Sequence, residues 1–308
     1  MNGESGRPKD VAVNYPLARL TTIRTGGTGD FFARPHTDAV LAELLGWASW
    51  EGIEVGVVGS GSNLLIADDG FRGLVIKLDG GLTTIEQDGQ RLVCGGGARL
   101  PQAAAFAARA GLSGLEFGVN IPGTVGGAVK MNANAYGGDL ARVLEWVDLT
   151  TSTGTQRRAP DQLGFRYRGS NLGPGEIVAR ASFALSDAEP ESVKATLADM
   201  RSARRAAQPS GIKTFGSTFK NPDDPRAEGR SAGVLLDEAG CRGLTVGGAG
   251  FSEKHANFVE NTGDATTADV IALMGEGRRR VRERFGVELE PEVQLLGHVD
   301  TAPLWGKP

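Results

Sequence analysis

Apolar residues at helical spacing predict several helices along the chain. Between residues 37 and 51 they recur three and four positions apart, with Thr37 as N-cap and Gly52 as stop signal. The same criteria predict helices over 102–110, 190–206, 231–239 and 266–285. In the last of these, Thr266 and Asp269 have the spacing of a capping box.

Short apolar runs bounded by turn residues predict strands between these helices. Asp88-Gly89 is a strong type I′ turn signal and predicts a hairpin between 83–87 and 91–94. Further strands are predicted over 53–58, 74–78, about 143–150, about 176–185 and 293–296. Strands and helices mixed in this order indicate an α+β protein with mixed sheets. The linker-like composition of Gln208–Gly211 predicts a boundary near residue 207, between a larger N-terminal and a smaller C-terminal part.

Composition excludes several classes of protein. The 46 glycines are about twice the usual share, but they follow no Gly-X-Y period and lie between apolar runs, which favours tight turns. A net charge of −4 gives no reason to expect nucleic acid. No apolar window reaches membrane-span length, and the N-terminus lacks the apolar core of a signal peptide. Cys94 and Cys241, as free thiols, fit a reducing compartment. We therefore expect a cytoplasmic protein. The sequence has no cluster of metal-ligating residues, so no metal site is expected. We also expect a monomer.

Two glycine-rich stretches carry the candidate chemistry. Phe117–Gly138 is uncharged except for Lys130. Its glycines allow main chain to approach a partner closely, and that partner is either another part of the protein or a flat ligand. Gly59–Asn63 follows a buried strand and has the small residues and hydroxyls of a phosphate cradle, although a strand-ending turn has the same composition. Neither stretch has the Rossmann or Walker pattern. Together they predict a dinucleotide such as FAD, bound without a Rossmann helix.

Seven segments in register resemble the UDP-N-acetylenolpyruvoylglucosamine reductase (MurB) family. They are Thr25–Gly27, Gly59–Leu65, Ile121–Gly138, Phe165–Ser170, Gly216–Pro222, Ser252–Phe258 and Phe285–Val293. The resemblance runs from about residue 20 to 297. The Gly-Ser-Asn and Ile-Pro-Gly pieces also occur in other non-Rossmann FAD-binding oxidoreductases, whereas the Gly216–Pro222 and Glu-Pro-Glu segments are typical of the reductase.

The resemblance implies a fold and a domain organisation. The fold would be of the non-Rossmann PCMH/VAO type, with two α+β FAD-binding subdomains and a smaller C-terminal α/β substrate domain. The FAD-binding region would span 20–206 and split near residue 78. The substrate domain would span 207–286, and 287–308 would return to the FAD-binding part. The chain has no room between Val178 and the helix at 190 for the tyrosine-bearing insertion of one family branch, so it resembles the shorter branch.

The resemblance also implies a reaction. NADPH reduces non-covalently bound FAD, and the flavin then passes hydride from N5 to the vinyl CH2 of enolpyruvyl-UDP-N-acetylglucosamine. The product is UDP-N-acetylmuramate, a precursor of peptidoglycan in the cell wall. Hydride addition pushes charge into the substrate carboxylate, so the site needs groups that hold this carboxylate and a donor that protonates the adjacent carbon.

The family motifs imply roles for particular residues. Arg168 would clamp the carboxylate, Ser217 would donate the proton, and Glu292 would assist one of these tasks. Glu288 and Glu290 share a face with Glu292 if the segment is a strand, so only the motif selects Glu292. FAD would be bound by Gly59, Ser60, Gly61, Ser62, Asn63, Leu64, Ile121, Pro122, Gly123, Thr124, Gly126, Gly127 and Val178. The substrate would be bound by Tyr167, Lys220, Asn221 and His255.

Local evidence leaves alternatives open for each of these residues. Arg168 alone would pass for a surface arginine, Ser217 for a serine in a turn, and Glu292 for a solvated carboxylate. Lys213 could reach the substrate phosphates, and the basic run Arg278–Arg284 is expected to be a solvated helix face. Two rival functions remain. One is a protein that binds FAD or a nucleotide sugar without turnover. The other is a flavin oxidase of the wider fold, although Phe117–Gly138 has no His or Cys for covalent flavin attachment.

Overall fold

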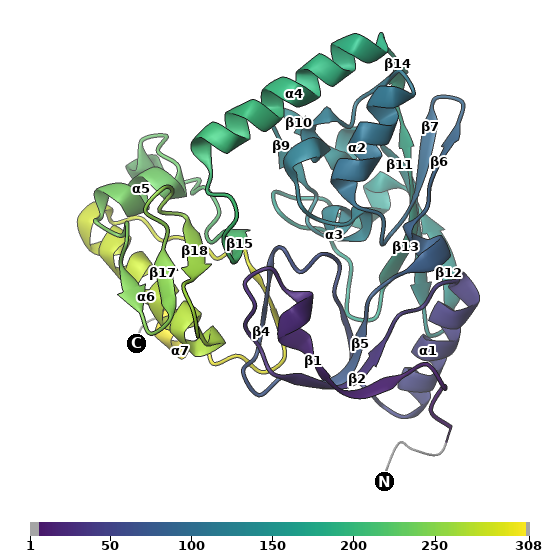
Figure 1. Ribbon diagram of the computed structural model, residues 1–308, viewed down its shortest axis with the longest axis horizontal. Helices are drawn as coiled ribbons and strands as arrows, with labels where there is room; N and C mark the ends of the chain where they lie inside the picture. Colours follow the sequence, from purple (N-terminus) through teal and green to yellow (C-terminus); the bar gives the residue numbers. More distant parts are fainter. Residues whose placement is uncertain (1–5, 306–308) are drawn as a thin grey trace. The chain divides into compact units, whose positions relative to one another are not determined.

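The computed structural model describes residues 6–305, and the chain divides into two compact units (Figure 1). Of the described residues, the first unit comprises 6–15, Asp30–Ser60 and Arg72–Arg204. The second comprises Pro16–Gly29, Gly61–Phe71 and 205–305. The division after Arg204 lies close to the boundary predicted near residue 207. Sequence reasoning did not place 16–29 and 61–71 in the second unit.

A five-stranded antiparallel sheet organises most of the first unit. Its strand order is β12-β11-β13-β7-β6. The bounds are β6 Ile85–Asp88, β7 Arg91–Gly95, β11 Leu144–Thr151, β12 Gly154–Arg158 and β13 Ile177–Ala184. Helix α2 (Leu100–Arg109) packs against β7, and α3 (Val125–Lys130) packs against β7 and β13. Small residues on both helices allow this close packing, because the buried positions of α2 other than Leu100 are alanines.

The β6–β7 hairpin is confirmed, but its turn is shifted by one residue. Asp88 pairs with Arg91, so the two loop residues are Gly89 and Gln90 rather than Asp88 and Gly89. Gly89 has φ of +60°, a left-handed conformation that glycine adopts without a Cβ clash. Two short antiparallel pairs complete this region: β8 (Leu112–Ser113) with β14 (Ser186–Asp187), and β9 (Asn134–Ala135) with β10 (Gly138–Asp139).

A second sheet and core lie at the other end of the first unit. The order is β1-β2-β5-β3, with β1 Ala12–Pro16, β2 Thr28–Ala33, β3 Val55–Val57 and β5 Phe71–Ile76. The strand predicted over 74–78 therefore begins and ends earlier. Helix α1 (Asp38–Trp50) is confirmed, with the Thr37 hydroxyl accepting a hydrogen bond from the Val40 N–H at 3.3 Å. Its buried leucines share a core with Leu74 and Ile76. Helix α4 (Pro190–Ala207) ends the unit's chain.

The second unit has its own sheet, helices and core. The antiparallel order is β15-β18-β17-β16, with β15 Thr214–Ser217, β16 Thr245–Val246, β17 Ala249–Phe251 and β18 Phe258–Asn261. Helices α5 (Ala232–Glu238), α6 (Thr267–Phe285) and α7 (Ala302–Trp305) accompany it, and β4 (Leu64–Ile66) pairs in parallel with β19 (Gln294–Leu296). Ile23 and Leu65 belong to the core of this unit, which explains why their segments join it.

The predicted start and end of α6 are confirmed. Thr266 and Asp269 form the capping box, and Gly286 ends the helix with φ of +71°. The Asp68 carboxylate adds a contact that the sequence did not suggest, since it accepts hydrogen bonds from the N–H groups of Thr267 and Ala268 at 2.7 and 2.9 Å. These groups are otherwise unsatisfied in the first turn of a helix, so Asp68 fixes the 64–68 segment to α6.

Candidate active site

Within the first unit, the start of the Gly59–Asn63 loop lies against the Phe117–Gly138 stretch. A Cβ on Gly59 would overlap the Thr124 hydroxyl, so the main chain of one loop packs directly on the other. Thr124 is the N-cap of α3, and its hydroxyl accepts a hydrogen bond from the Gly127 N–H at 3.3 Å. The Gly123 carbonyl accepts one from the Leu100 N–H at 3.1 Å. The segments predicted to bind the diphosphate and the flat ring of a dinucleotide are therefore neighbours.

Two features of these loops fit an FAD ligand. Within residues 6–305, the buried Ser60 hydroxyl has no hydrogen-bond partner. Such a group is costly unless a ligand or water satisfies it. A Cβ on Gly123 would meet only Ile121 Cγ2, at 3.8 Å, so the fold itself does not require glycine there. An unsatisfied donor and an uncovered stretch of main chain are what a diphosphate or a flat ring needs.

Other glycines of the Phe117–Gly138 stretch are explained by the protein alone. A Cβ on Gly118 would lie 2.8 Å from Leu100 Cγ, and one on Gly138 would lie 3.0 Å from the Phe117 side chain. One on Gly126 would lie 3.1 Å from the Gly96 carbonyl and 3.5 Å from the Val178 side chain. For these positions the close partner is another part of the protein, which was the first of the two alternatives.

Lys77 is a basic residue at the Gly59 loop that sequence reasoning missed. Its ammonium group donates a hydrogen bond to the Gly59 carbonyl. Burial lowers the pKa of Lys77, and the nearby positive charges of Arg34 and Arg99 lower it further. The positive charge of Lys77 at this loop suits an anionic ligand. The signal in the sequence was weak, because Lys77 follows directly on a buried strand and resembles an ordinary strand-end lysine.

Arg168 lies in a tight turn whose geometry fixes its side chain. Arg166 and Gly169 exchange two main-chain hydrogen bonds, of 3.0 and 3.1 Å, around Tyr167 and Arg168. Arg168 has φ of +56°, a conformation that is uncommon for a residue with a side chain. Its Nη1 donates to the carbonyl and side-chain oxygens of Asn134, at 3.2 and 2.8 Å. Asn134 belongs to the Ile121–Gly138 motif, and its role as the acceptor for Arg168 could not be read from the sequence.

In the second unit, the segments that carry Ser217 and Glu292 run side by side. The Glu292 N–H donates to the Thr218 carbonyl at 2.9 Å, and the Lys220 N–H donates to the Glu290 carbonyl at 2.9 Å. Phe219 and Pro291 form a β-bridge between these two bonds. Ser217 and Glu292 are 75 positions apart in the sequence, and main-chain hydrogen bonds hold the segments that carry them together.

Ser62 and Asn63, from the loop that begins at Gly59, also contact the segments that carry Ser217 and Glu292. The Asn63 side-chain amide donates to the Glu292 carbonyl at 3.1 Å, and the Asn63 carbonyl accepts from the Gln294 N–H at 3.1 Å. A Cβ on Gly216 would lie 3.6 Å from the Ser62 carbonyl. Asn63 was predicted to bind FAD, and the structure gives it a structural contact with the segment that carries Glu292.

The three neighbouring glutamates have different environments. The expected strand alternation is wrong, because 287–290 form no strand and Pro291 makes only an isolated bridge. Glu288 forms an ion pair with Arg278, and Glu290 forms one with Lys220, each at 3.0 Å. Glu292 is the one of the three whose N–H is bonded to the Thr218 carbonyl, directly after Ser217.

Two of the predicted substrate residues contact the start of helix α5. The Asn221 side-chain oxygen accepts a hydrogen bond from the Ala232 N–H at 3.1 Å. His255 packs so closely on Gly233 that a Cβ there would lie 2.7 Å from its Cε1. Its Nδ1 accepts from the Asn257 N–H at 3.2 Å, and burial is the main cause that lowers the pKa of His255. His255 is therefore held mainly neutral at pH 7, as a hydrogen-bonding group.

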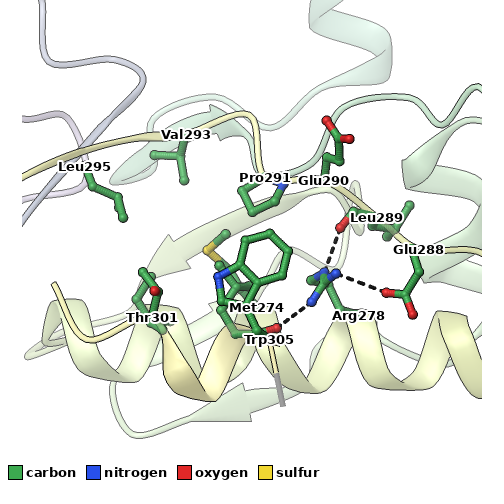
Figure 2. A pocket seen from close by; sticks show the side chains of 12 residues that line it. Met274, Arg278, Glu288, Leu289, Glu290, Pro291, Val293, Leu295, Thr301 and Trp305 are labelled. Atoms are coloured by element: carbon green, nitrogen blue, oxygen red, sulfur yellow. Dashed lines mark hydrogen bonds and ion pairs between the residues drawn. The ribbon is translucent and has the colours of Figure 1, made fainter. Parts of the chain in front are cut away.

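A cavity of about 500 Å³ in the second unit lies beneath the 288–295 segment (Figure 2). Its lining includes Pro291 and Val293 but neither Ser217 nor Glu292. The solvated-face prediction is wrong for Arg278, which is only 8% exposed at this cavity. The physical reason is that its Nε and Nη1 donate to the carbonyls of Leu289 and Leu304, at 2.6 and 2.7 Å, so the cation is satisfied internally.

The described part of the chain has neither a metal-binding cluster nor a membrane-spanning helix. Residues 6–305 contain no cluster of three or more His, Cys, Asp or Glu side chains able to hold a metal ion. Over the same residues, none of the helices has the length and apolarity needed to cross a membrane.

Comparison with known proteins first defines the class. A family model described as an FAD binding domain matches residues 29–160, which include the Gly59 and Ile121–Gly127 loops. The protein is therefore an FAD-binding flavoprotein, and the predicted α+β fold with a non-Rossmann FAD-binding part is confirmed.

The family follows from longer matches. A model of the C-terminal domain of UDP-N-acetylenolpyruvoylglucosamine reductase matches residues 208–296. Enzymes of that name from Symbiobacterium thermophilum and Heliobacterium modesticaldum are each 43% identical and cover 92% of this chain, and the matches span 91% and 89% of their own lengths. The crystal structure of the reductase from Thermus caldophilus is 38% identical, with a TM-score of 0.79 over 93% of this chain and 98% of its own. The chain belongs to the UDP-N-acetylenolpyruvoylglucosamine reductase family.

Proposed function

We propose that this protein is a cytoplasmic, monomeric reductase that uses NADPH and FAD. Its substrate is the enolpyruvyl ether of UDP-N-acetylglucosamine, and its product is UDP-N-acetylmuramate for peptidoglycan synthesis. The observation that carries the proposal is the pairing of the Ser217 and Glu292 segments by main-chain hydrogen bonds. A protein that only bound FAD or a nucleotide sugar would need no such pairing of a proton donor with a carboxylate.

Gly59, Ser60 and the 121–127 loop are the residues of the first unit that would hold FAD. The unsatisfied Ser60 hydroxyl and the uncovered main chain at Gly123 support this assignment. Lys77 would add positive charge behind the Gly59 carbonyl. When bound, FAD supplies the hydride that is added to the vinyl carbon of the substrate, after reduction by NADPH.

The remaining steps belong to side chains of this chain. Arg168 holds the substrate carboxylate, since a guanidinium keeps its charge and presents several donors to two oxygens. Asn134 keeps that guanidinium in place. As charge moves into the carboxylate, Ser217 gives its proton to the adjacent carbon. A hydroxyl is a weak acid in water, but the enol-like intermediate is strongly basic and needs a well-placed donor.

Glu292 is the third member of the proposed machinery. The Glu292 N–H and carbonyl are hydrogen-bonded to the Thr218 carbonyl and the Asn63 side chain. These bonds fix the main chain from which the Glu292 side chain extends. We assign it to proton delivery or to holding the substrate carboxylate group. Lys220, Asn221, His255 and Tyr167 are proposed to contact the nucleotide-sugar part of the substrate. Lys213 is a further candidate for its phosphates.

The purified protein tests this proposal through its flavin colour. NADPH should bleach the 450 nm absorbance, and the enolpyruvyl substrate should restore it under anaerobic conditions. In Ser217→Ala, bleaching should stay normal while recolouring slows by about 10²- to 10⁴-fold, the usual contribution of a general acid. Ser192→Ala, an exposed serine on α4, serves as the control and should behave like the wild type. Bleaching without recolouring in the wild-type protein would refute the reductase function.

A further inference from the structure

The buried amide of Asn257 braces the segment that carries Ser217. Asn257 directly precedes β18 and is 4% exposed. Its Oδ1 accepts a hydrogen bond from the Phe219 N–H at 2.9 Å, and its Nδ2 donates to the Phe219 carbonyl at 2.9 Å. The Asn257 carbonyl also accepts from the Thr218 N–H at 2.8 Å. One residue therefore satisfies three main-chain groups immediately after Ser217.

This brace is needed because the Ser217 segment is irregular. The pairing of β15 with β18 shifts register between Thr214 and Ser217, and Gly216 has φ of +85°. After Ser217 the chain leaves the sheet and turns towards Pro291, so regular ladder bonds to β18 no longer hold it. The Asn257 side chain supplies the two bonds that a continuing strand would have made with its neighbour.

The same segment is bonded to Glu292 on its other side. The Thr218 carbonyl accepts from the Glu292 N–H, while the Thr218 N–H is held by Asn257. A displacement of residues 218–219 would therefore move both Ser217 and Glu292. We propose that Asn257 is a positioning residue for proton transfer: it acts through the main chain of residues 218–219 and does not touch the substrate. This inference rests on the proposed role of Ser217.

Asn261, at the other end of β18, offers a matched control. It is also buried, at 8% exposure, and its amide also makes main-chain hydrogen bonds. Its Nδ2 donates to the Ile23 carbonyl at 2.9 Å, and its Oδ1 accepts from the N–H groups of Gly263 and Ala265 at 3.0 and 3.3 Å. These bonds serve a different part of the unit. Loss of either asparagine removes a comparable buried network, but only Asn257 lies beside Ser217.

The test measures the two half-reactions of the full-length holoenzyme in Asn257→Ala and Asn261→Ala, with their melting temperatures. In Asn257→Ala, bleaching by NADPH should remain within about twofold of wild type. Recolouring by the enolpyruvyl substrate should slow about 10- to 100-fold, the scale expected when a reacting group is displaced by about 1 Å. In Asn261→Ala both rates should stay near wild type despite a similar loss of melting temperature.

A second variant covers the case in which Asn257→Ala does not fold. Asn257→Asp keeps the shape and can still accept from the Phe219 N–H, but a carboxylate cannot donate to the Phe219 carbonyl, so recolouring alone should again slow. Equal slowing of both half-reactions, or wild-type recolouring in a folded variant, would overturn the positioning role. Ser217→Ala is measured in parallel. If it recolours slowly while Asn257→Ala recolours normally, only this inference fails; if Ser217→Ala recolours normally, the proposed function fails with it.

Discussion

Replacement of single glycines in the Phe117–Gly138 stretch should separate the needs of the fold from those of the cofactor. A Cβ at Gly123 meets only Ile121 Cγ2 at 3.8 Å, which is ordinary van der Waals contact, and Gly123 is outside the left-handed region. Gly123→Ala should therefore leave the flavin-free protein as stable as wild type, or stabilise it by about 0.4–1 kcal/mol. The gain would arise because alanine lowers the conformational entropy of the unfolded chain. If main chain at Gly123 faces FAD, the added methyl group should nevertheless weaken FAD binding.

Gly118→Ala should show the opposite behaviour. Its Cβ would lie 2.8 Å from Leu100 Cγ, and Leu100 is fully buried in the core. Overpacking of this kind costs about 1–3 kcal/mol. With a shift of about 2–4 °C for each kcal/mol in a domain of this size, the melting temperature should fall by roughly 2–12 °C. FAD affinity should change little, because the strain falls on Leu100 of helix α2 in the hydrophobic core.

The assay is fluorescence titration of deflavinated protein with FAD, combined with thermal unfolding of the same samples. Gly123→Ala should raise the FAD dissociation constant about tenfold or more, which corresponds to about 1.4 kcal/mol. A wild-type dissociation constant for Gly123→Ala would show that this glycine does not face the cofactor. The interpretation of the 121–127 loop as an FAD-binding loop would then have to be abandoned.

Four further results are expected. Asn134→Ala removes the side-chain acceptor of Arg168, a hydrogen bond to a charged group worth about 1.5–3 kcal/mol, so the KM for the enolpyruvyl substrate should rise about 10- to 100-fold while flavin bleaching by NADPH is unchanged. Burial raises the pKa of Cys94 to about 12 and that of Cys241 to about 11, so neither should react with a disulfide reagent at pH 8 until the protein unfolds. Because the unfolded thiols ionise near pH 9, stability should also decrease as the pH rises from 9 towards these values, and a flat alkaline stability profile would contradict the burial argument. Asp68→Ala should lower the stability by about 0.5–2 kcal/mol, measured by denaturant unfolding, because two N–H groups of the first turn of α6 lose their acceptor.

Elements with local signals could be predicted from the sequence. The caps of α1 and α6 depend on residues within three positions of each other, so Thr37 and the Thr266–Asp269 box marked these helices correctly. The missed strands lacked such signals. All but the last residue of β12 are exposed, so the edge strand has no apolar alternation. In β15, Gly216 and a register shift interrupt the pairing with β18, and its sequence resembles a loop.

The segments 16–29 and 61–71 belong to the second unit because of contacts with residues far away in the sequence. Ile23 and Leu65 contribute to the core that α6 covers, yet each lies more than 130 residues from the start of the C-terminal part. Nothing in their immediate surroundings distinguishes them from core residues of the first unit. Burial could be predicted from their apolar character, whereas the choice between two cores could not.

The candidate site was predicted through family motifs, because local chemistry was ambiguous. For the glutamates, the structure adds that the Glu292 N–H is bonded to the carbonyl of Thr218, the residue after Ser217, and that the Glu292 carbonyl is bonded to the Asn63 side chain. The positioning residues Asn134 and Asn257 lay inside quoted motifs. Their roles depend on hydrogen bonds to residues 34 and 38 positions away, which no spacing rule reveals.

The Gly59–Leu64 loop shows why one motif can carry two functions. The sequence predicted a single phosphate cradle. In the structure, Gly59 and Ser60 belong to the first unit, where Thr124 and Lys77 contact Gly59. Gly61–Leu64 belong to the second unit, where Asn63 is bonded to the segment that carries Glu292. Gly61 has φ of +63° and no room for a Cβ beside the Leu20 carbonyl, so the second unit requires glycine at this position. The small residues of the loop are therefore required both by the proposed FAD site and by the placement of the proposed catalytic carboxylate.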